Sequence, residues 1–143
     1  MPNYKSRWDN YNFFFAYGIL IPVFLVMLIF SDATAKEWLM VMFSLLGGIT
    51  VLLLIIYFTT SYKIDGQYLR YSSFIFFGKI KIKNINKLEV GKTMYVGMKP
   101  AFARHGIIVR YNKYDEIYIS PPDNNEFVEE LLKINPEIEV VRA

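Results

Sequence analysis

Hydrophobic residues are concentrated in two long stretches near the N-terminus. Residues 10–31 and 38–62 contain no charged side chain, and their most apolar parts are residues 13–30 and 38–58. As a helix, the second part would be about 31 Å long, close to the bilayer's hydrocarbon thickness of about 30 Å. Neither stretch has a polar face for contact with water. The pattern therefore predicts two transmembrane helices, over about residues 11–31 and 38–59.

The segment between the two predicted helices, residues 31–37, is so short that the helices must form an antiparallel hairpin. Lys5 and Arg7 precede the first helix, Lys63 and Arg70 follow the second, and the connection carries only Lys36. Because cytoplasmic flanks of membrane helices are enriched in Lys and Arg, this distribution predicts a multi-pass protein of the bacterial cell membrane with cytoplasmic N- and C-termini.

Two features of the N-terminal part, residues 1–60, leave alternatives open. An A-x-A motif at residues 33–35, after an apolar run, resembles a secretory signal that is cleaved after Ala35. Ser44 and Gly48 have a spacing of four, which permits close helix approach. This approach is either to the first helix or to a second copy of the chain, so a homodimer through Ser44 and Gly48 is one of the two expectations.

The second part, residues 61–143, has the patterns of a small folded domain. Asp65-Gly66 is a hairpin signal between strand-like runs at residues 60–64 and 67–73. Alternating Lys and Ile predict a strand over residues 79–83, and shorter apolar runs predict further strands. These further runs are residues 88–90, 106–111, 116–120 and 138–141. Residues 123–134 have the apolar stripe of an amphipathic helix with Asp123 as its N-cap, so the sequence predicts an α+β fold with antiparallel strands.

Several motifs of this domain agree with the pattern of one family. They are Tyr62-x-Ile64, Leu69-x-Tyr71, Ile80-x-Ile82, Lys99-Pro100-Ala101, Ile107-x-Val109-x-Tyr111, and a long signature with Ile119-Ser120-Pro121-x-Asp123, Phe127, Leu131 and Asn135-Pro136-x-Ile138. The chain thereby resembles the bacterial PH-like domains that follow one or two membrane helices, the group that includes the sublancin immunity protein. The resemblance implies a PH-like β-barrel or half-barrel with a C-terminal helix, and it implies no catalytic residues.

Composition excludes several kinds of active site. The 143 residues include no Cys and a single His, His105, which excludes thiol nucleophiles, zinc–thiolate centres and multi-histidine metal sites. The sequence has no Gly-rich phosphate loop and no evident Ser-His-Asp set. We therefore expect a protein that is not an enzyme and that needs no metal or cofactor.

Charge is distributed unevenly along the predicted domain. Residues 63–104 carry nine basic and two acidic side chains, whereas residues 105–143 carry four basic and eight acidic ones. Lys79, Lys81 and Lys83 on one face of the predicted strand, with Lys87 nearby, form the candidate surface for anionic lipid headgroups or for a protein or peptide partner. Each lysine close to an anionic membrane contributes about 1 kcal/mol. The alternative is a solvated outer face of the sheet, and no nucleic-acid partner is expected.

Phe74, Ile75, Phe76 and Phe77 are four consecutive large apolar residues beside the basic strand. They are a candidate loop for insertion into the membrane interface, and packing inside the barrel or against the helices is the alternative.

Together these patterns predict a non-enzymatic integral membrane protein that presents a PH-like binding module at the cytoplasmic membrane face. The family resemblance adds immunity against a membrane-acting bacteriocin as an alternative function.

Overall fold

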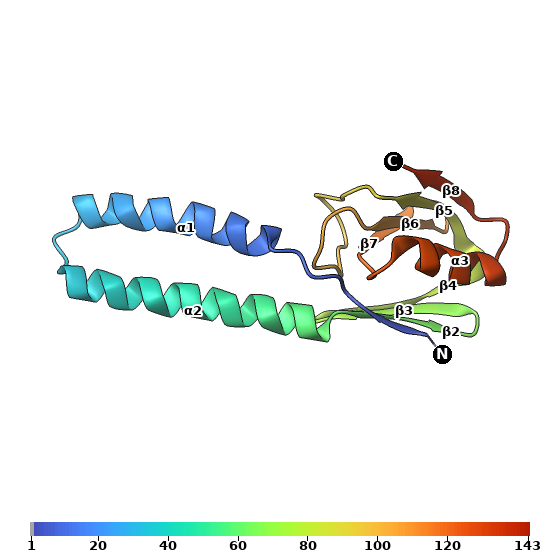
Figure 1. The fold of residues 1–143 in the computed structure, drawn as a ribbon, viewed down its shortest axis with the longest axis horizontal. Helices are drawn as coiled ribbons and strands as arrows, with labels where there is room; N and C mark the ends of the chain where they lie inside the picture. Colours follow the sequence, from blue (N-terminus) through green and yellow to red (C-terminus); the bar gives the residue numbers. More distant parts are fainter. Residues whose placement is uncertain (1) are drawn as a thin grey trace. The chain divides into compact units, whose positions relative to one another are not determined.

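The computed structural model describes residues 2–143, which divide into two compact units. Asn10–Ile55 form a helical unit, whereas Ile56–Ala143 and the N-terminal residues up to Asp9 form a unit of strands and one further helix. Figure 1 shows these elements in chain order. The predicted α+β fold is confirmed, because two long apolar helices are followed by sheets and a C-terminal helix.

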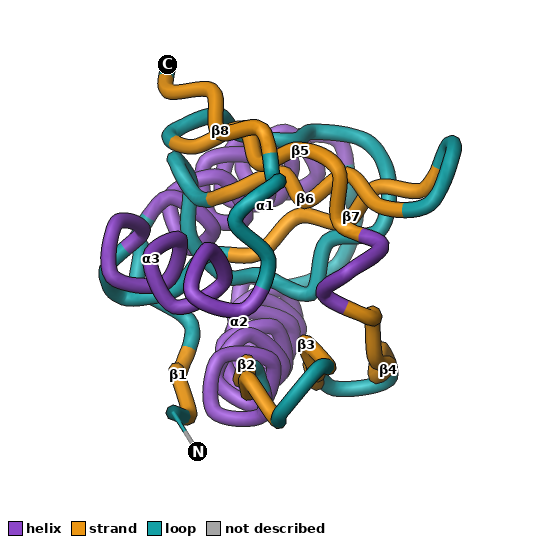
Figure 2. The backbone as a smooth tube through the Cα atoms, turned by 90° about the vertical axis from the view of Figure 1, so that its right-hand side faces the viewer, coloured by secondary structure: helices purple, strands orange, loops and turns teal. Residues whose placement is uncertain are grey.

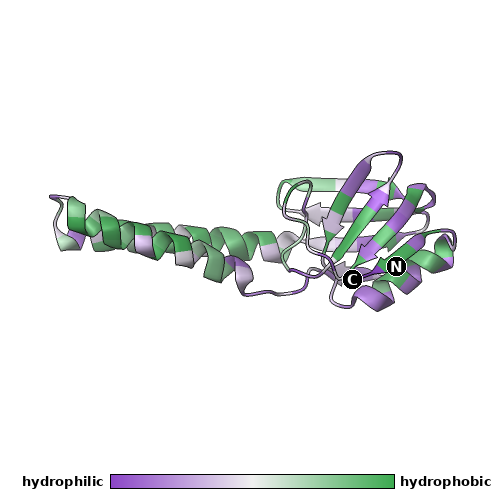
Figure 3. Ribbon diagram, turned by 90° about the horizontal axis from the view of Figure 1, so that it is seen from above, coloured by the Kyte–Doolittle hydropathy of each residue, from purple (hydrophilic) through white to green (hydrophobic). Residues whose placement is uncertain are grey.

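Helix α1 spans Tyr11–Phe30 and helix α2 spans Ala35–Thr59. Both are long and apolar enough to cross a membrane, and hydrophobic residues follow almost without interruption along them in Figure 3, which indicates membrane association. Helix α2 begins earlier than the apolar run predicts because Thr34 and Glu37 form a capping box. The Glu37 carboxylate accepts a hydrogen bond from the Thr34 backbone N–H at 2.9 Å, and the Glu37 N–H donates to the Thr34 hydroxyl at 3.4 Å.

Contacts between α1 and α2 come from aromatic and polar side chains. Tyr17 and Thr50 share a hydrogen bond between their hydroxyl groups, and the rings of Phe24 and Trp38 lie 6.0 Å apart, edge to face. Gly48 does not contribute a close approach to α1, because a Cβ added there would meet no atom within 4 Å. The small-residue spacing on α2 therefore lies on a face that α1 does not cover.

The first sheet of the domain unit has the strand order β1-β2-β3-β4, with every neighbouring pair antiparallel. These strands are β1 (Asn3–Lys5), β2 (Ser61–Asp65), β3 (Tyr68–Ser73) and β4 (Phe76–Lys81). Gly66 follows β2 in the predicted hairpin turn with a φ of 58°, a conformation that favours glycine. The hydrophobic pattern does not predict β1, because three residues are too few to show an alternation.

Residues after β1 continue into the domain. The Ser6 side chain is buried, its hydroxyl lies 2.8 Å from the Ser120 hydroxyl, and it accepts a hydrogen bond from the Phe102 backbone N–H at 3.0 Å. The Arg7 backbone N–H donates to the Ser120 carbonyl at 2.8 Å. These bonds attach the segment that precedes α1 to the domain that follows α2.

The second sheet has the order β7-β6-β5-β8. Its strands are β5 (Ile85–Val90), β6 (Ile107–Tyr111), β7 (Asp115–Ile119) and β8 (Glu139–Arg142). Strand β8 pairs with β5 in parallel, in contrast to the expectation of antiparallel strands throughout. Strand β7 runs in the same direction as β5, because both pair antiparallel with β6. The connection from β7 to β8 contains a helix, which allows β8 to run in this direction as well.

The strand predicted over residues 79–83 is wrong at its end. Strand β4 stops at Lys81, and Ile82–Asn84 form a short 3₁₀ helix, η1, before β5. Ile82 and Ile85 are both buried, and their spacing of three places them on one side of a 3₁₀ turn. In a continuous strand these two residues would face opposite sides. The chain therefore turns from the first sheet to the second at this point.

Helix α3 (Asn124–Ile134) begins as predicted, with Asp123 as its cap. The Asp123 carboxylate accepts hydrogen bonds from the backbone N–H groups of Asn125 and Glu126 at 2.8 and 3.2 Å. Figure 2 shows α3 along one side of the unit, next to strands of both sheets. Its apolar stripe completes a core that contains Tyr62, Ile64, Leu69, Ile80, Ile82, Ile85, Leu88, Ile107, Val109, Ile117, Ile119, Phe127, Val128 and Leu131.

Candidate functional site: a cationic row on the first sheet

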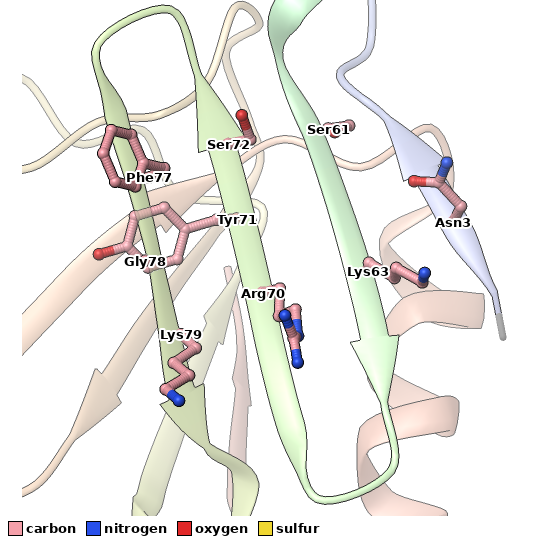
Figure 4. Close-up of a pocket in the computed structure, with 9 residues that line it drawn as sticks. All are labelled: Asn3, Ser61, Lys63, Arg70, Tyr71, Ser72, Phe77, Gly78 and Lys79. Carbon is pink, nitrogen blue, oxygen red and sulfur yellow. The ribbon is translucent and has the colours of Figure 1, made fainter.

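Three basic residues lie side by side on the outer face of the first sheet. Lys63 of β2 pairs directly with Arg70 of β3, and Arg70 pairs with Lys79 of β4. Asn3 of β1 extends the same row, because it pairs with Lys63. We call Lys63, Arg70 and Lys79 the cationic row. Figure 4 shows their side chains on neighbouring strands, with the side chain of Asn3 at the end of the row.

The local sequence explains why these cations share one face. Adjacent residues in a strand point to opposite faces of the sheet. Lys63 therefore points away from the face of the buried Ile64, and Lys79 points away from the face of the buried Ile80. The apolar members of each pair belong to the core, which leaves the basic members on the outside. The row is therefore a consequence of the hydrophobic alternation together with the hairpin register.

The cationic row is electrostatically unfavourable in the absence of a ligand. Neighbouring strands are about 4.8 Å apart, and like charges directly opposite each other destabilise a sheet by about 0.2–1 kcal/mol per pair. Within residues 2–143, the ion pairs involving the row are limited to one, between Arg70 and Asp65 at 3.0 Å. The Lys79 ammonium lies 5.3 Å from the centre of the Tyr68 ring. An anion bound between the three side chains would offset the repulsion.

The cationic row borders a shallow depression of about 460 Å³. Ser61, Ser72 and Phe77 form the next row of the sheet and line the same depression. Figure 4 shows the Tyr71 ring reaching across β4 at Gly78, where a Cβ would lie 2.5 Å from the Tyr71 hydroxyl oxygen. Glycine at this position therefore permits the tyrosine ring to cross the neighbouring strand. The depression offers a ligand the cations of the row, the serine hydroxyl groups and the exposed ring of Phe77.

The structure separates the four lysines that the sequence suggests as one surface. Lys79 and Lys81 share the exposed face of β4, but Lys83 lies in η1 and Lys87 lies in β5 of the second sheet. Lys87 also forms an ion pair with Glu139 at 3.0 Å. The single basic face predicted from Lys79 to Lys87 is therefore not formed.

Lys63 and Arg70 were missed by sequence reasoning although a signal for them exists. The Asp65-Gly66 turn implies a tight hairpin, and pairing outward from this turn sets Lys63 opposite Arg70. Pairing of Arg70 with Lys79 could not be predicted in the same way, because the length and geometry of the β3–β4 turn were unknown.

The predicted interfacial residues are exposed. Phe74 and Ile75 form the turn between β3 and β4, and Phe76 and Phe77 begin β4, so only half of the predicted loop is a turn. Phe74 has a φ of 46°, which is unusual for a bulky residue, and its N–H donates to the Thr59 hydroxyl at 2.9 Å. This hydrogen bond fixes the turn beside the C-terminal residues of α2 that belong to the same unit.

Two buried titratable groups outside the cationic row, Glu89 and Tyr62, have structural partners. Glu89 is only 7% exposed, and the hydrogen bond from Lys92, together with the nearby charge of Arg110, holds its pKa below the ordinary value. Burial raises the pKa of Tyr62 to about 12, and the Tyr62 hydroxyl donates to the Pro100 carbonyl at 2.6 Å. No cluster of three or more potential metal ligands of the His, Cys, Asp and Glu types lies among residues 2–143.

A family model described as Bacterial PH domain matches residues 60–135, which is more than half of the chain. The matched segment contains the whole cationic row and α3, and it confirms the bacterial PH-like domain that the motifs predict. No curated protein and no solved structure matches the chain.

Proposed function

We propose that this chain, which belongs to the bacterial PH domain family, is a non-enzymatic, membrane-anchored binding module for the phosphate groups of anionic lipid headgroups. The ligand site is the cationic row, and it acts at the cytoplasmic surface of the bacterial cell membrane. The observation that carries the proposal is the direct pairing of Lys63 with Arg70 and of Arg70 with Lys79 on one exposed face.

The chemistry of the row favours a phosphate group. Arg70 can offer two parallel N–H donors to one phosphate, and lysines on both sides add point charges and further donors. Three cations on neighbouring strands can reach one phosphate group or two adjacent ones, since the strands are only about 4.8 Å apart. The serine hydroxyl groups of the next row add neutral hydrogen-bonding partners for a headgroup.

The position of the row in the chain favours a ligand in the membrane. Lys63 follows the end of α2 at Thr59 by four residues, which is about 13 Å of extended chain. Phe77 lies on the same face as Lys79, one row nearer to the strand end that joins α2. The aromatic residue suits a position near the boundary of the acyl chains, and the cations suit the phosphate layer next to it.

Pairing of β1 with β2 supports a hairpin topology. Strand β1 precedes α1 and β2 follows α2, yet the two strands form one ladder through Asn3–Lys63 and Tyr4–Tyr62. If both helices cross the membrane, they must therefore leave and return on the same side. The distribution of basic residues then assigns this side to the cytoplasm.

The test compares the lipids that co-purify with the full chain in a mild non-ionic detergent. Membranes containing phosphatidylglycerol and phosphatidylethanolamine are extracted, and the bound lipids are measured by mass spectrometry. Replacing Lys63, Arg70 and Lys79 with Gln should remove the enrichment of phosphatidylglycerol. At about 1 kcal/mol for each cation, the expected loss is roughly 100-fold in relative affinity.

A matched control removes the same charge elsewhere. Lys83, Lys113 and Lys133 are exposed and lie outside the cationic row, so their replacement with Gln should leave the enrichment unchanged. Equal loss in both triple variants would mean that net charge alone attracts the lipid, and retention in both would move the ligand site elsewhere. Co-purification of an acidic peptide in place of lipid would replace the lipid ligand by a peptide.

We propose a homodimer through Ser44 and Gly48 as the assembly of this module. The uncovered position of Gly48 supports it, because close approach of a second helix is possible there. Replacing Gly48 with Ile should reduce crosslinking between chains in the membrane, whereas replacing the lipid-exposed Met40 with Ile should not.

Immunity against a membrane-acting bacteriocin rests on the family resemblance alone. Expression of the full chain in a sensitive host should then reduce killing by the bacteriocin, and unchanged killing would remove this function.

A further inference from the structure

Most of the large, exposed apolar side chains of the domain unit lie in two loops. One is the β3–β4 turn, where Ile75 is 65% exposed and Phe77, at the start of β4, is 80% exposed. The other is the connection between β5 and β6, where Tyr95 is 80% exposed and Val96 is 86% exposed. Burying such side chains contributes about 25 cal/mol for each Å² of apolar surface removed from water, so both loops favour an apolar environment.

Both loops lie near the last turn of α2. The Phe74 N–H bonds to the Thr59 hydroxyl at 2.9 Å, which holds the first loop beside this turn. In the second loop, the Met98 sulfur accepts a hydrogen bond from the Tyr71 hydroxyl at 3.4 Å. Phe102, a few residues further on, has its ring 5.4 Å from that of Tyr57. Both connections therefore place the loops at the end of the domain where the chain leaves α2.

Aromatic and basic residues surround the same end of the domain. The Trp8 ring packs against the rings of Tyr57 and Phe102, at 4.8 and 5.4 Å. Lys99 and Arg104 belong to the same β5–β6 connection as Val96, and Arg104 forms an ion pair with Asp9 at 2.9 Å. Aromatic side chains concentrate at membrane–water interfaces, and cations next to them meet the anionic headgroups.

We infer that the two loops form a bilayer-docking surface, in which Ile75 and Phe77 from the first loop and Tyr95 and Val96 from the second enter the interfacial layer of the membrane that holds the helices. The lipid bilayer is the occupant because the loops are fixed beside the end of an apolar helix that is long enough to cross it. Interfacial insertion buries apolar side chains to a depth of about 5–10 Å, which side chains at loop tips can reach.

Docking through two loops would set the orientation of the domain against the bilayer, in addition to the attachment that the helices provide. Thr60 is buried and its hydroxyl lies 2.7 Å from the Ser73 hydroxyl, which attaches the last turn of α2 to the domain. Two separate loops in the interface fix the orientation of the domain, and this orientation holds the cationic row at a constant height above the acyl chains. The docking does not require the cationic row, because its driving force is the burial of apolar surface.

The test uses the full chain in nanodiscs of phosphatidylcholine with brominated acyl chains, which quench tryptophan fluorescence on contact. In a background with Trp8→Phe and Trp38→Phe, single tryptophans are introduced by Ile75→Trp or Val96→Trp. Both should lose fluorescence relative to nanodiscs without bromine, because insertion to a depth of about 5–10 Å brings the tryptophans to the acyl chains.

Tyr114→Trp is the matched control. Tyr114 is 85% exposed, close to the 86% of Val96, but it lies in the β6–β7 turn, at the opposite end of these strands from Ile107 and Ile119. Its fluorescence should not be quenched by bromine.

Absence of quenching at both loop positions would overturn the docking surface, and so would equal quenching at Tyr114→Trp. Protection of the loop tryptophans from a water-soluble quencher without bromine quenching would also overturn it, because a second copy or another protein would then cover the loops. Since the lipid is zwitterionic, these results are independent of anion binding by the cationic row. Near-ultraviolet circular dichroism of each variant verifies that the domain is folded.

Discussion

Neutralising one member of the cationic row should make the ligand-free domain more stable. Lys63 is the most suitable position, because it opposes only Arg70 within the row, whereas Lys79 also lies 5.3 Å from the Tyr68 ring. Gln at this position keeps a similar length and polarity but removes the charge. Arg70 is less suitable, since its replacement would also remove the ion pair with Asp65.

The expected gain follows from the cross-strand geometry. One like-charged pair directly opposite in a sheet costs about 0.2–1 kcal/mol, so Lys63→Gln should raise the free energy of unfolding by this amount at low ionic strength. The Debye length is about 30 Å at 0.01 M salt and falls to about 3 Å at 1 M, which screens charges on neighbouring strands. The gain should therefore be largest at low salt and disappear at high salt, while binding of anionic lipid becomes weaker in the same variant.

Urea unfolding of the full chain in non-ionic detergent measures this effect. In a Trp38→Phe background, Trp8 reports on the domain, because its ring packs against Phe102. Lys83→Gln is the control, since Lys83 lies in η1, outside the row. A loss of stability in Lys63→Gln at low salt, or a gain that is the same at high salt, would refute the electrostatic reasoning.

Further predictions concern the core, the pH dependence and the topology. Leu131→Ala should lower the free energy of unfolding by about 2–5 kcal/mol, because Leu131 is fully buried. Leu132 is only partly buried, so Leu132→Ala should lower it less. Equal losses of stability in thermal unfolding would contradict the packing of α3. The ionised Glu89 stabilises the folded state at pH values above its ordinary pKa of 4.5, and this contribution is lost as the pH falls through its lowered pKa. Glu89→Gln should therefore flatten the acid side of a plot of melting temperature against pH. An unchanged slope would contradict this role of Glu89. A reporter that is active only in the cytoplasm should be active after Ala143, and activity of a periplasmic reporter there would reverse the topology.

The α+β fold could be predicted from the sequence because its signals are local. The uncharged stretches predict α1 and α2, the Asp65-Gly66 turn predicts the β2–β3 hairpin, and Asp123 with its apolar stripe predicts α3. Strand β1 and the parallel pairing of β8 depend on contacts between distant parts of the chain. A strand of three residues has too few positions to show which face is buried.

The candidate site could be predicted only in part for the same reason. Lys79 is recognisable as an exposed strand residue, but its neighbours in space come from β3 and β2, not from the following residues of the chain. Lys83 has the alternation of a strand residue, yet the need to bury both Ile82 and Ile85 turns the chain there. The register between strands decides which cations lie side by side, and the pattern of residues along a single strand does not determine this register.

Measuring contact between Arg70 and a lipid phosphate is the most direct test of anion binding by the cationic row. Solid-state NMR of the full chain with ¹⁵N-labelled arginine, in bilayers that contain phosphatidylglycerol, measures the dipolar coupling between guanidinium nitrogen and ³¹P. A phosphate bound in the cationic row predicts strong dephasing of one arginine signal that disappears in Arg70→Gln. Dephasing that is unaffected by Arg70→Gln, or none at all, would contradict anion binding by the row.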